Sequence, residues 1–336
     1  MSTANRAGTR TGTHKMKNEK SIVNRSNTER QMPSSGLWLH RYSKLVVLVS
    51  FVLIVAGGLV TSTHSGLSVP DWPLSYGQWM PPMVGGVFYE HSHRMIAAAV
   101  GFMTLILAFW IGMTEKRAWL RWLGIVALAA VVVQGLLGGM TVLFLLPAPV
   151  SIFHACLAQT FFALLVSVAY VTSQEWRDCR SGVTLPERDP STPILKKLVL
   201  MTTALIYAQL ILGATVRHTD ASLVIVSHVI GAFFVLVHIL FVVVLAFKCD
   251  GKTGSDQGVE RRPAPLKVPA AFLGVVFILQ MGLGIGAFIY TRMLAQTLQP
   301  ALGKVFFVTA HQTLGALVLA SSIFLSLRVF RREPQS

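Results

Sequence analysis

The stretch GGLVTSTHSGL at residues 57–67 decides the fold, because part of its residue pattern recurs in GATVRHTDASL at residues 213–223. Gly, Val, Thr and Leu occupy the same four places in both copies, and each copy follows a long run of apolar residues. A pattern that recurs in this way indicates a duplicated structural unit. The sequence therefore predicts two related halves, each built on apolar segments.

The composition places these halves in a lipid bilayer. The chain has 336 residues, of which 53% are hydrophobic and only 13% are charged. A helix of about 20 apolar residues spans a bilayer, and runs of that kind are expected at 44–62, 92–113, 118–142, 150–173, 194–215, 222–247, 268–290 and 304–328. We therefore expect an all-α integral membrane protein whose eight transmembrane helices form two pseudo-symmetric four-helix bundles.

The domain boundaries follow from the duplication and from the polar segments between the apolar runs. A Gln-x-x-x-Gly pattern in spans three, five and seven puts Gln and Gly on one helix face, which predicts close helix packing. An even number of spans in each half makes the halves parallel repeats. The expected domains are a disordered basic cytoplasmic tail at 1–43, an N-terminal bundle at 44–173, a cytoplasmic linker at 174–193, a C-terminal bundle at 194–328 and a cytoplasmic tail at 329–336.

The basic residues indicate the orientation of the chain. The formal net charge is +15, and of 29 Lys and Arg residues only Arg94, Arg217, Arg292 and Lys304 fall on one side of the predicted membrane. Cytoplasmic loops of membrane proteins are enriched in Lys and Arg, so both termini are expected in the cytoplasm. The positive charge then fits contact between loops and anionic lipid, and nucleic-acid binding is not expected.

Four histidines occupy matching places, at His93, His154, His228 and His311. Each begins an apolar stretch at the outer membrane face, and Ala or Gly follows four residues later. An imidazole in a membrane needs a partner, and a small residue one turn further leaves a gap beside the ring. Histidine is a common axial ligand of haem iron. The pattern predicts two haem sites with two histidine ligands each, one site in each half.

The halves differ in the segment between the first two spans, SGLSVPDWPLSYGQWMPPMVGGVFYEHSHR, which is much longer than its counterpart in the second half. It contains Glu90 three residues before His93, and no other repeated histidine has an acidic residue at that place. A carboxylate in a low-dielectric site can stabilise positive charge or take up protons, so Glu90 is the candidate catalytic residue. Arg94 and Arg217 are candidates for binding haem propionates, because guanidinium pairs with carboxylate.

At these residues the chain resembles the haem A synthase family. The resemblance rests on GGLVTSTHSGLSVPDWPLSYG at 57–77, PPMVGGVFYEHSHR at 81–94, HACLAQ at 154–159, VRHT at 216–219 and HQTLGA at 311–316. These pieces are spread over the whole membrane region. The resemblance implies oxidation of the C8 methyl of haem O to a formyl group, which yields haem A for terminal oxidases, in the inner membrane of a bacterial cell.

The resemblance also implies roles for the candidate residues. His93 and His154 correspond to ligands of the substrate haem O, and Glu90 corresponds to an essential carboxylate. His228 and His311 correspond to ligands of a haem b cofactor that relays electrons. The implied partners are haem O, haem A, haem O synthase and oxidase assembly factors, besides the lipid bilayer. Association into a homo-oligomer is a further expectation.

Two other classes of protein fit the same pattern. A quinone-linked electron carrier with two b-type haems would use the four histidines without modifying haem. A transporter would also contain parallel repeats. Conversion of haem O distinguishes the enzyme from the carrier, and bound haem in the purified protein distinguishes both from the transporter.

Overall fold

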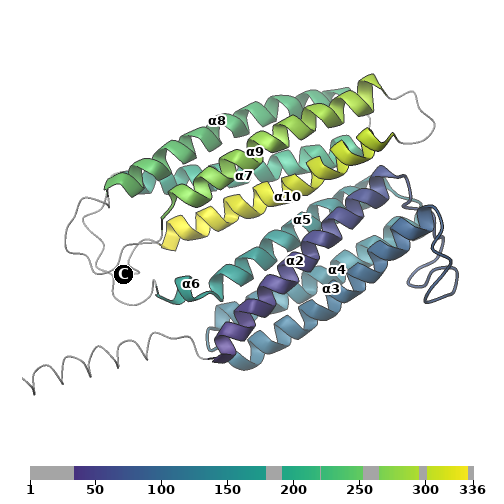
Figure 1. The fold of residues 1–336 in the computed structure, drawn as a ribbon, viewed down its shortest axis with the longest axis horizontal. Helices are drawn as coiled ribbons and strands as arrows, with labels where there is room; N and C mark the ends of the chain where they lie inside the picture. The colour runs from purple at the N-terminus through teal and green to yellow at the C-terminus, as the bar shows by residue number, and fades with distance from the viewer. Residues whose placement is uncertain (1–33, 179–190, 220, 253–264, 295–300, 332–336) are drawn as a thin grey trace, which may run out of the picture.

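The fold is a set of long helices that run alongside one another (Figure 1). The computed structural model describes residues 34–178, 191–219, 221–252, 265–294 and 301–331. Its helices are α2 (Ser34–Ser62), α3 (Gly86–Thr114), α4 (Ala118–Leu143), α5 (Ala148–Val171), α6 (Gln174–Asp178), α7 (Ser191–His218), α8 (Ser222–Lys252), α9 (Lys267–Phe288), the π-helix η1 (Ile289–Met293) and α10 (Leu302–Arg331). Eight helices are long and apolar enough to cross a membrane, and the described ranges contain no β-strand. The prediction of an all-α multi-pass membrane protein with eight spans is confirmed.

The first span starts earlier than the hydropathy pattern predicts. α2 begins at Ser34, so the expected disordered tail at 1–43 is wrong for residues 34–43, which are helical. The imidazole of His40 forms a hydrogen bond of 2.9 Å to the Ala169 carbonyl on α5. Contacts with a neighbouring helix thus stabilise a polar helical segment that hydropathy alone assigns to the tail.

The polar segments at the other expected boundaries are described only in part. Residues 1–33, 179–190 and 332–336 lie outside the described part of the chain. The expected linker starts with α6, where the Glu175 carboxylate accepts hydrogen bonds of 2.8 and 2.6 Å from the Arg328 guanidinium of α10. This ion pair joins the end of the first four spans to the end of the last span.

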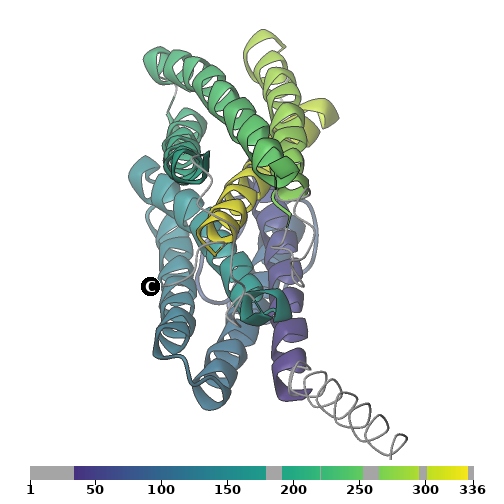
Figure 2. The same cartoon turned by 90° about the vertical axis from the view of Figure 1, so that its left-hand side faces the viewer.

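The helices pack mainly on neighbours from the same half of the sequence. α2 and α4 both contact α3 and α5, and in the same way α7 and α9 both contact α8 and α10. Figure 1 shows α2–α5 on one side of the molecule and α7–α10 on the other. α5 also contacts α7 and α10, and α10 also contacts α2. The fourth helix of each half therefore lies at the contact between the halves, with α10 in the middle of the molecule (Figure 2).

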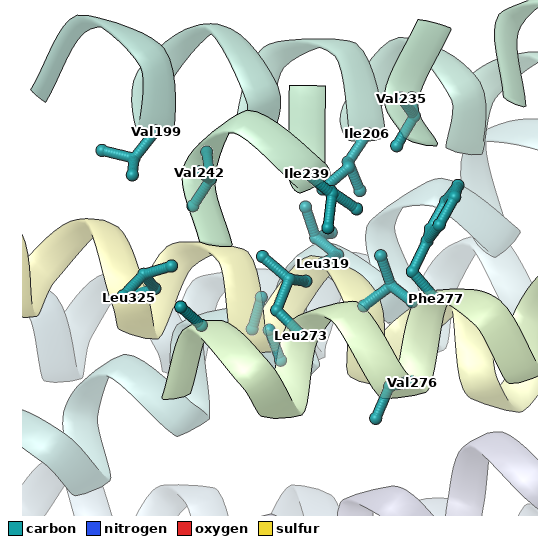
Figure 3. Packing of buried hydrophobic residues seen from close by; sticks show 14 of the residues in the cluster. Val199, Ile206, Val235, Ile239, Val242, Leu273, Val276, Phe277, Leu319 and Leu325 are labelled. Atoms are coloured by element: carbon teal, nitrogen blue, oxygen red, sulfur yellow. The ribbon is translucent and has the colours of Figure 1, made fainter. Parts of the chain in front are cut away.

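Buried apolar side chains form two clusters. The larger cluster takes members such as Ile239, Leu273 and Leu319 from the second half (Figure 3), and it extends to Ile54 of α2 and Phe162 of α5. The other cluster lies within the first half. Since lipid tails are as apolar as these side chains, close dispersion contacts hold such helices together in a bilayer. This apolar packing is continuous across the contact between the halves.

One end of the molecule, called the loop end below, carries the connection between α2 and α3, residues 63–85 (Figure 1). The four repeated histidines lie in the first three turns of the helices that begin there, α3, α5, α8 and α10. Because α3 begins at Gly86, Glu90 and His93 lie on the same helix, less than one turn apart.

Candidate functional site

Each repeated histidine lies against a glycine of the preceding long helix. A Cβ atom added at the glycine would lie 3.1 Å from Cε1 of His93 at Gly57, 3.3 Å from Cε1 of His154 at Gly138, 3.0 Å from Cε1 of His228 at Gly213 and 2.8 Å from Cε1 of His311 at Gly284. These distances are tighter than nearly all real contacts of a Cβ atom. A larger residue at any of these places would require the imidazole to shift, and the same contact, called a glycine notch below, occurs twice in each half.

The residue four positions before each glycine contacts the same ring. These residues are Leu53, Gln134, Gln209 and Gln280. Their backbone carbonyls all face the imidazole of the next long helix. A histidine that binds a metal through one ring nitrogen normally donates its other N–H to a nearby oxygen, which fixes the orientation of the ring. The Gln-x-x-x-Gly pattern, which predicted only close packing, marks residues that orient the imidazoles.

The three glutamines also bring their side-chain amides to the rings. Gln134 Nε2 lies 3.4 Å from His154 Nε2 and donates to the His154 carbonyl at 3.0 Å. Gln209 Nε2 lies 3.0 Å from His228 Nδ1 and also donates to the His228 carbonyl. α2 has Leu53 at this place, so the ring of His93 has no corresponding amide.

The second histidine pair has the spacing of two ligands on one metal ion. The ring centres of His228 and His311 are 6.3 Å apart, and the ring planes meet at 85°. Metal–imidazole bonds are about 2 Å long, and a ring nitrogen lies roughly 1 Å from the ring centre, so imidazoles on opposite sides of one ion have centres about 6 Å apart. His311 Nδ1 donates to the Gln280 carbonyl at 3.0 Å, and Nε2 makes only a long contact of 3.5 Å with the Gln280 side-chain amide, so Nε2 is the ring nitrogen that could bind a metal.

The first histidine pair makes weaker contacts with the protein. The Nδ1 atoms of His93 and His154 are buried, and neither makes a hydrogen bond of normal geometry within the described residues. The two imidazoles are close enough to each other for a charge on His154 to affect His93. Burying a polar nitrogen without a partner costs about 1–3 kcal/mol, so the protein holds the first pair of rings less firmly than the second pair. In both halves, the paired imidazoles are side chains of the kind that bind haem iron.

Glu90 is almost fully buried, with 3% of its surface exposed, and two donors hold its carboxylate. Oε1 accepts a hydrogen bond of 2.6 Å from Arg94, and Oε2 accepts one of 2.9 Å from the Val69 amide of the α2–α3 connection. Arg94 also donates to the carbonyls of Asp71 and Leu74, each at 2.7 Å. The Glu90–Arg94 pair therefore ties the α2–α3 connection to the first turns of α3.

The α2–α3 connection, called the lid below (residues 63–85), reaches the helices next to the first histidine pair. The Trp72 ring lies so close to Gly139 that a Cβ there would be 2.8 Å from it. Gly139 directly follows Gly138, the glycine beside His154. Ser75 Oγ is hydrogen-bonded to Nδ1 of the buried His91 at 2.8 Å. The sequence pointed to the lid as a feature of the first half, but not to Trp72 as the side chain that packs beside the site.

Comparisons with known proteins agree with this arrangement. A model of a family described as cytochrome oxidase assembly protein matches residues 40–86 and 84–234, which is more than half of the chain. The chain belongs to this family. Among curated relatives, heme A synthase of Halalkalibacterium halodurans is 31% identical over 192 residues, heme A synthase of Alkalihalophilus pseudofirmus is 29% identical over 190, and heme A synthase of Geobacillus kaustophilus is 27% identical over 189. The resemblance found in the sequence motifs is confirmed.

The matches to this family cover part of each protein. The aligned regions make up 54% of the chain and 57–60% of the three relatives. The family match ends at residue 234, so it includes the lid, His93, His154 and His228 but not His311. The assignment of His311 therefore depends on the duplication, because its contact with Gly284 repeats the three earlier histidine–glycine contacts.

The two arginine candidates of this family member lie in different surroundings. Arg94 is beneath the lid and donates to Glu90 and to lid carbonyls. Arg217 ends α7 at the contact between the halves, where its Nη2 donates to Ser62 Oγ of α2 at 3.3 Å. The binding of haem propionates by either arginine remains a prediction.

Proposed function

We propose that this protein is a haem A synthase, which oxidises the C8 methyl group of haem O to a formyl group. The observation that carries the proposal is the asymmetry between two equivalent histidine pairs. Both have glycine notches, but within the described residues a lid and a buried carboxylate are found only beside the first pair. Membership of the family and the curated heme A synthases among the relatives support the same reaction.

In this proposal the N-terminal bundle binds the substrate and the C-terminal bundle binds a cofactor. His93 and His154 hold haem O, and His228 and His311 hold a haem b, which supplies one-electron transfer when bound. The two bundles are pseudo-symmetric, with both termini in the cytoplasm and the loop end at the outer face. The distribution of Lys and Arg supports this orientation in a bacterial inner membrane.

The side chains of the first half have separate tasks. Conversion of a methyl to a formyl group adds one oxygen atom and, counted against water, removes four electrons and four protons. Glu90 is in a water-poor position where a carboxylate stabilises positive charge at the methyl carbon or accepts a proton. Arg94 positions that carboxylate and keeps the lid closed over it. Trp72 packs on α4 and excludes water from the site.

Several partners follow from this proposal. Haem O must enter from the enzyme that makes it, and haem A must leave to the assembly factors of the oxidase. We propose contacts with both kinds of protein within the bilayer. Association of the chain with a second copy remains a prediction.

The test is to supply haem O and an electron acceptor, in air-saturated buffer, to the purified full-length protein and to separate the haem products by chromatography. We expect a formyl haem in the wild-type reaction and none with His93→Ala. Bound b-type haem without any formyl product would favour the two-haem electron carrier. Absence of bound haem from the purified protein would favour a transporter.

A further inference from the structure

A cluster of basic and hydroxyl side chains lies at the loop end, where the two halves meet. It consists of Ser62 at the end of α2, His64 at the start of the lid, Arg217 at the end of α7, and Lys304 and Thr309 in the first turns of α10, and is called the junction cluster below. Ser62 Oγ accepts hydrogen bonds from Arg217 at 3.3 Å and from Thr309 at 3.0 Å. Lys304 Nζ lies 3.5 Å from His64 Nε2.

The positive charge of the junction cluster is not balanced by the described part of the chain. No acidic side chain there pairs with Arg217 or Lys304, and Arg217 Nε is buried without a hydrogen-bond acceptor. Burial and the charges of Lys304 and Arg217 lower the pKa of His64, so its ring is neutral near pH 7 and retains one N–H. A basic side chain at a membrane helix end is costly to bury without an anion.

The cluster is also narrow. A Cβ added at Gly58 of α2 would lie 3.0 Å from Cγ2 of Thr309, so α2 and α10 approach closely beside the basic groups. Basic groups beside so close a helix contact suit a small anionic group better than the surface of another protein. Arginine and lysine recognise carboxylate and phosphate oxygens through charge-assisted hydrogen bonds.

We propose that the junction cluster is a binding site for one carboxylate or phosphate group, contacted by both halves at once. Two sources carry this chemistry. One is a propionate of a haem bound at a histidine pair, and this source rests on the proposed function. The other is the headgroup of an anionic phospholipid, which does not depend on the proposed function.

The first arm of the test compares haem with haem dimethyl ester, in which both propionates are blocked. Each is titrated into the full-length protein and followed by absorbance. If a propionate occupies the cluster, the wild type binds haem about tenfold more tightly than the ester. Arg217→Gln should lose this preference, whereas Arg217→Lys and the exposed loop-end control Arg292→Gln should keep it.

The second arm places the full-length protein in nanodiscs of phosphatidylglycerol and phosphatidylcholine and measures retained lipid by native mass spectrometry. If a phospholipid occupies the cluster, the wild type and Arg292→Gln retain phosphatidylglycerol and Arg217→Gln loses it. Lys304→Gln is measured in both arms as a second variant, in case Arg217→Gln fails to fold. The proposal is overturned if neither arm changes with either substitution. Neither arm measures formyl haem, so failure of the proposed function would be seen separately.

Discussion

The His93–His154 pair and the His228–His311 pair lie at equivalent places in the two halves, yet their surroundings differ. In the second half, His311 Nδ1 is hydrogen-bonded to the Gln280 carbonyl and an amide reaches each ring. In the first half, neither Nδ1 atom makes a hydrogen bond within the described residues. The lid packs beside this site and is hydrogen-bonded to Glu90. The proposed function assigns the cofactor to the half with the more firmly held imidazoles and the substrate to the half with the lid.

This difference teaches that the two halves share one arrangement of histidines and glycines and that the lid and Glu90 are additional features of the first half. The histidine–glycine contact is common to all four positions, so under the proposed function it serves haem binding in both halves. The lid, Glu90 and Leu53 belong to the first half alone. Each prediction below tests whether the properties of the two halves separate in this way.

The largest effect is expected from removing a ligand of the second pair. His228→Ala or His311→Ala should abolish the low-spin b-type absorbance spectrum, because six-coordinate ligation of iron is lost. His93→Ala and His154→Ala should keep that spectrum and lose haem A formation. Equal loss of haem b in all four variants would contradict the separation of the two sites.

A smaller effect is expected at the glycine notch of the second half. Gly284→Ala puts a methyl group 2.8 Å from Cε1 of His311, whereas a Cβ at Gly282 on the same helix meets nothing within 4 Å. Overpacking of this kind costs about 1–3 kcal/mol, so haem b occupancy should fall about tenfold. Occupancy is measured as haem per protein after purification. A similar fall in Gly282→Ala would show that general weakening of α9 is responsible.

The same comparison in the first half should give a milder result. A Cβ at Gly138 would lie 3.3 Å from the His154 ring, and one at Gly135 on α4 meets nothing within 4 Å. Gly138→Ala should lower haem A formation severalfold and leave haem b occupancy unchanged, while Gly135→Ala should change neither. Loss of haem b in Gly138→Ala would mean that the two sites are coupled.

The smallest effect concerns the attachment of the lid. Hydrogen bonds from the amides of Gly77 and Tyr76 lower the pKa of the Asp71 carboxyl. A lowered folded-state pKa means that the contribution of Asp71 is complete above its ordinary pKa and is lost as pH falls through the lowered value. Proteolysis of the lid in the wild type should therefore increase only at acid pH. Asp71→Asn should remove this acid step, and a step that persists in the variant would assign it to another group.

The sequence was sufficient to predict the number of spans, the duplication and the four equivalent histidines, because these depend on local hydropathy and on repeated spacing. It placed the start of the first span too late, because the contact of His40 with α5 involves residues far apart in the chain. The glycine notches had a visible signal in the Gln-x-x-x-Gly pattern, but that pattern did not tell which side chain the glycine would face.

The contacts of the lid could not be predicted from the sequence, because they too join residues that are far apart in the chain. Nothing in the spacing of Trp72 and Gly139 indicates that the indole packs on α4. The ion pair between Glu90 and Arg94 follows from their positions one turn apart on a helix. Their hydrogen bonds to Val69, Asp71 and Leu74 depend on how the lid folds back.

The measurement that tests the central claim most directly is the yield of haem A per bound haem b in the wild type and in Glu90→Gln. The substitution keeps the shape of the side chain and its acceptor for the Val69 amide, but it removes the charge. If Glu90 acts on the substrate of the lidded half, the ratio should fall at least about tenfold, which corresponds to about 1.4 kcal/mol of transition-state stabilisation. Arg94→Gln, which loosens the same lid but keeps the carboxylate, should lower the ratio less. An unchanged ratio in Glu90→Gln, with haem b still bound, would contradict the account.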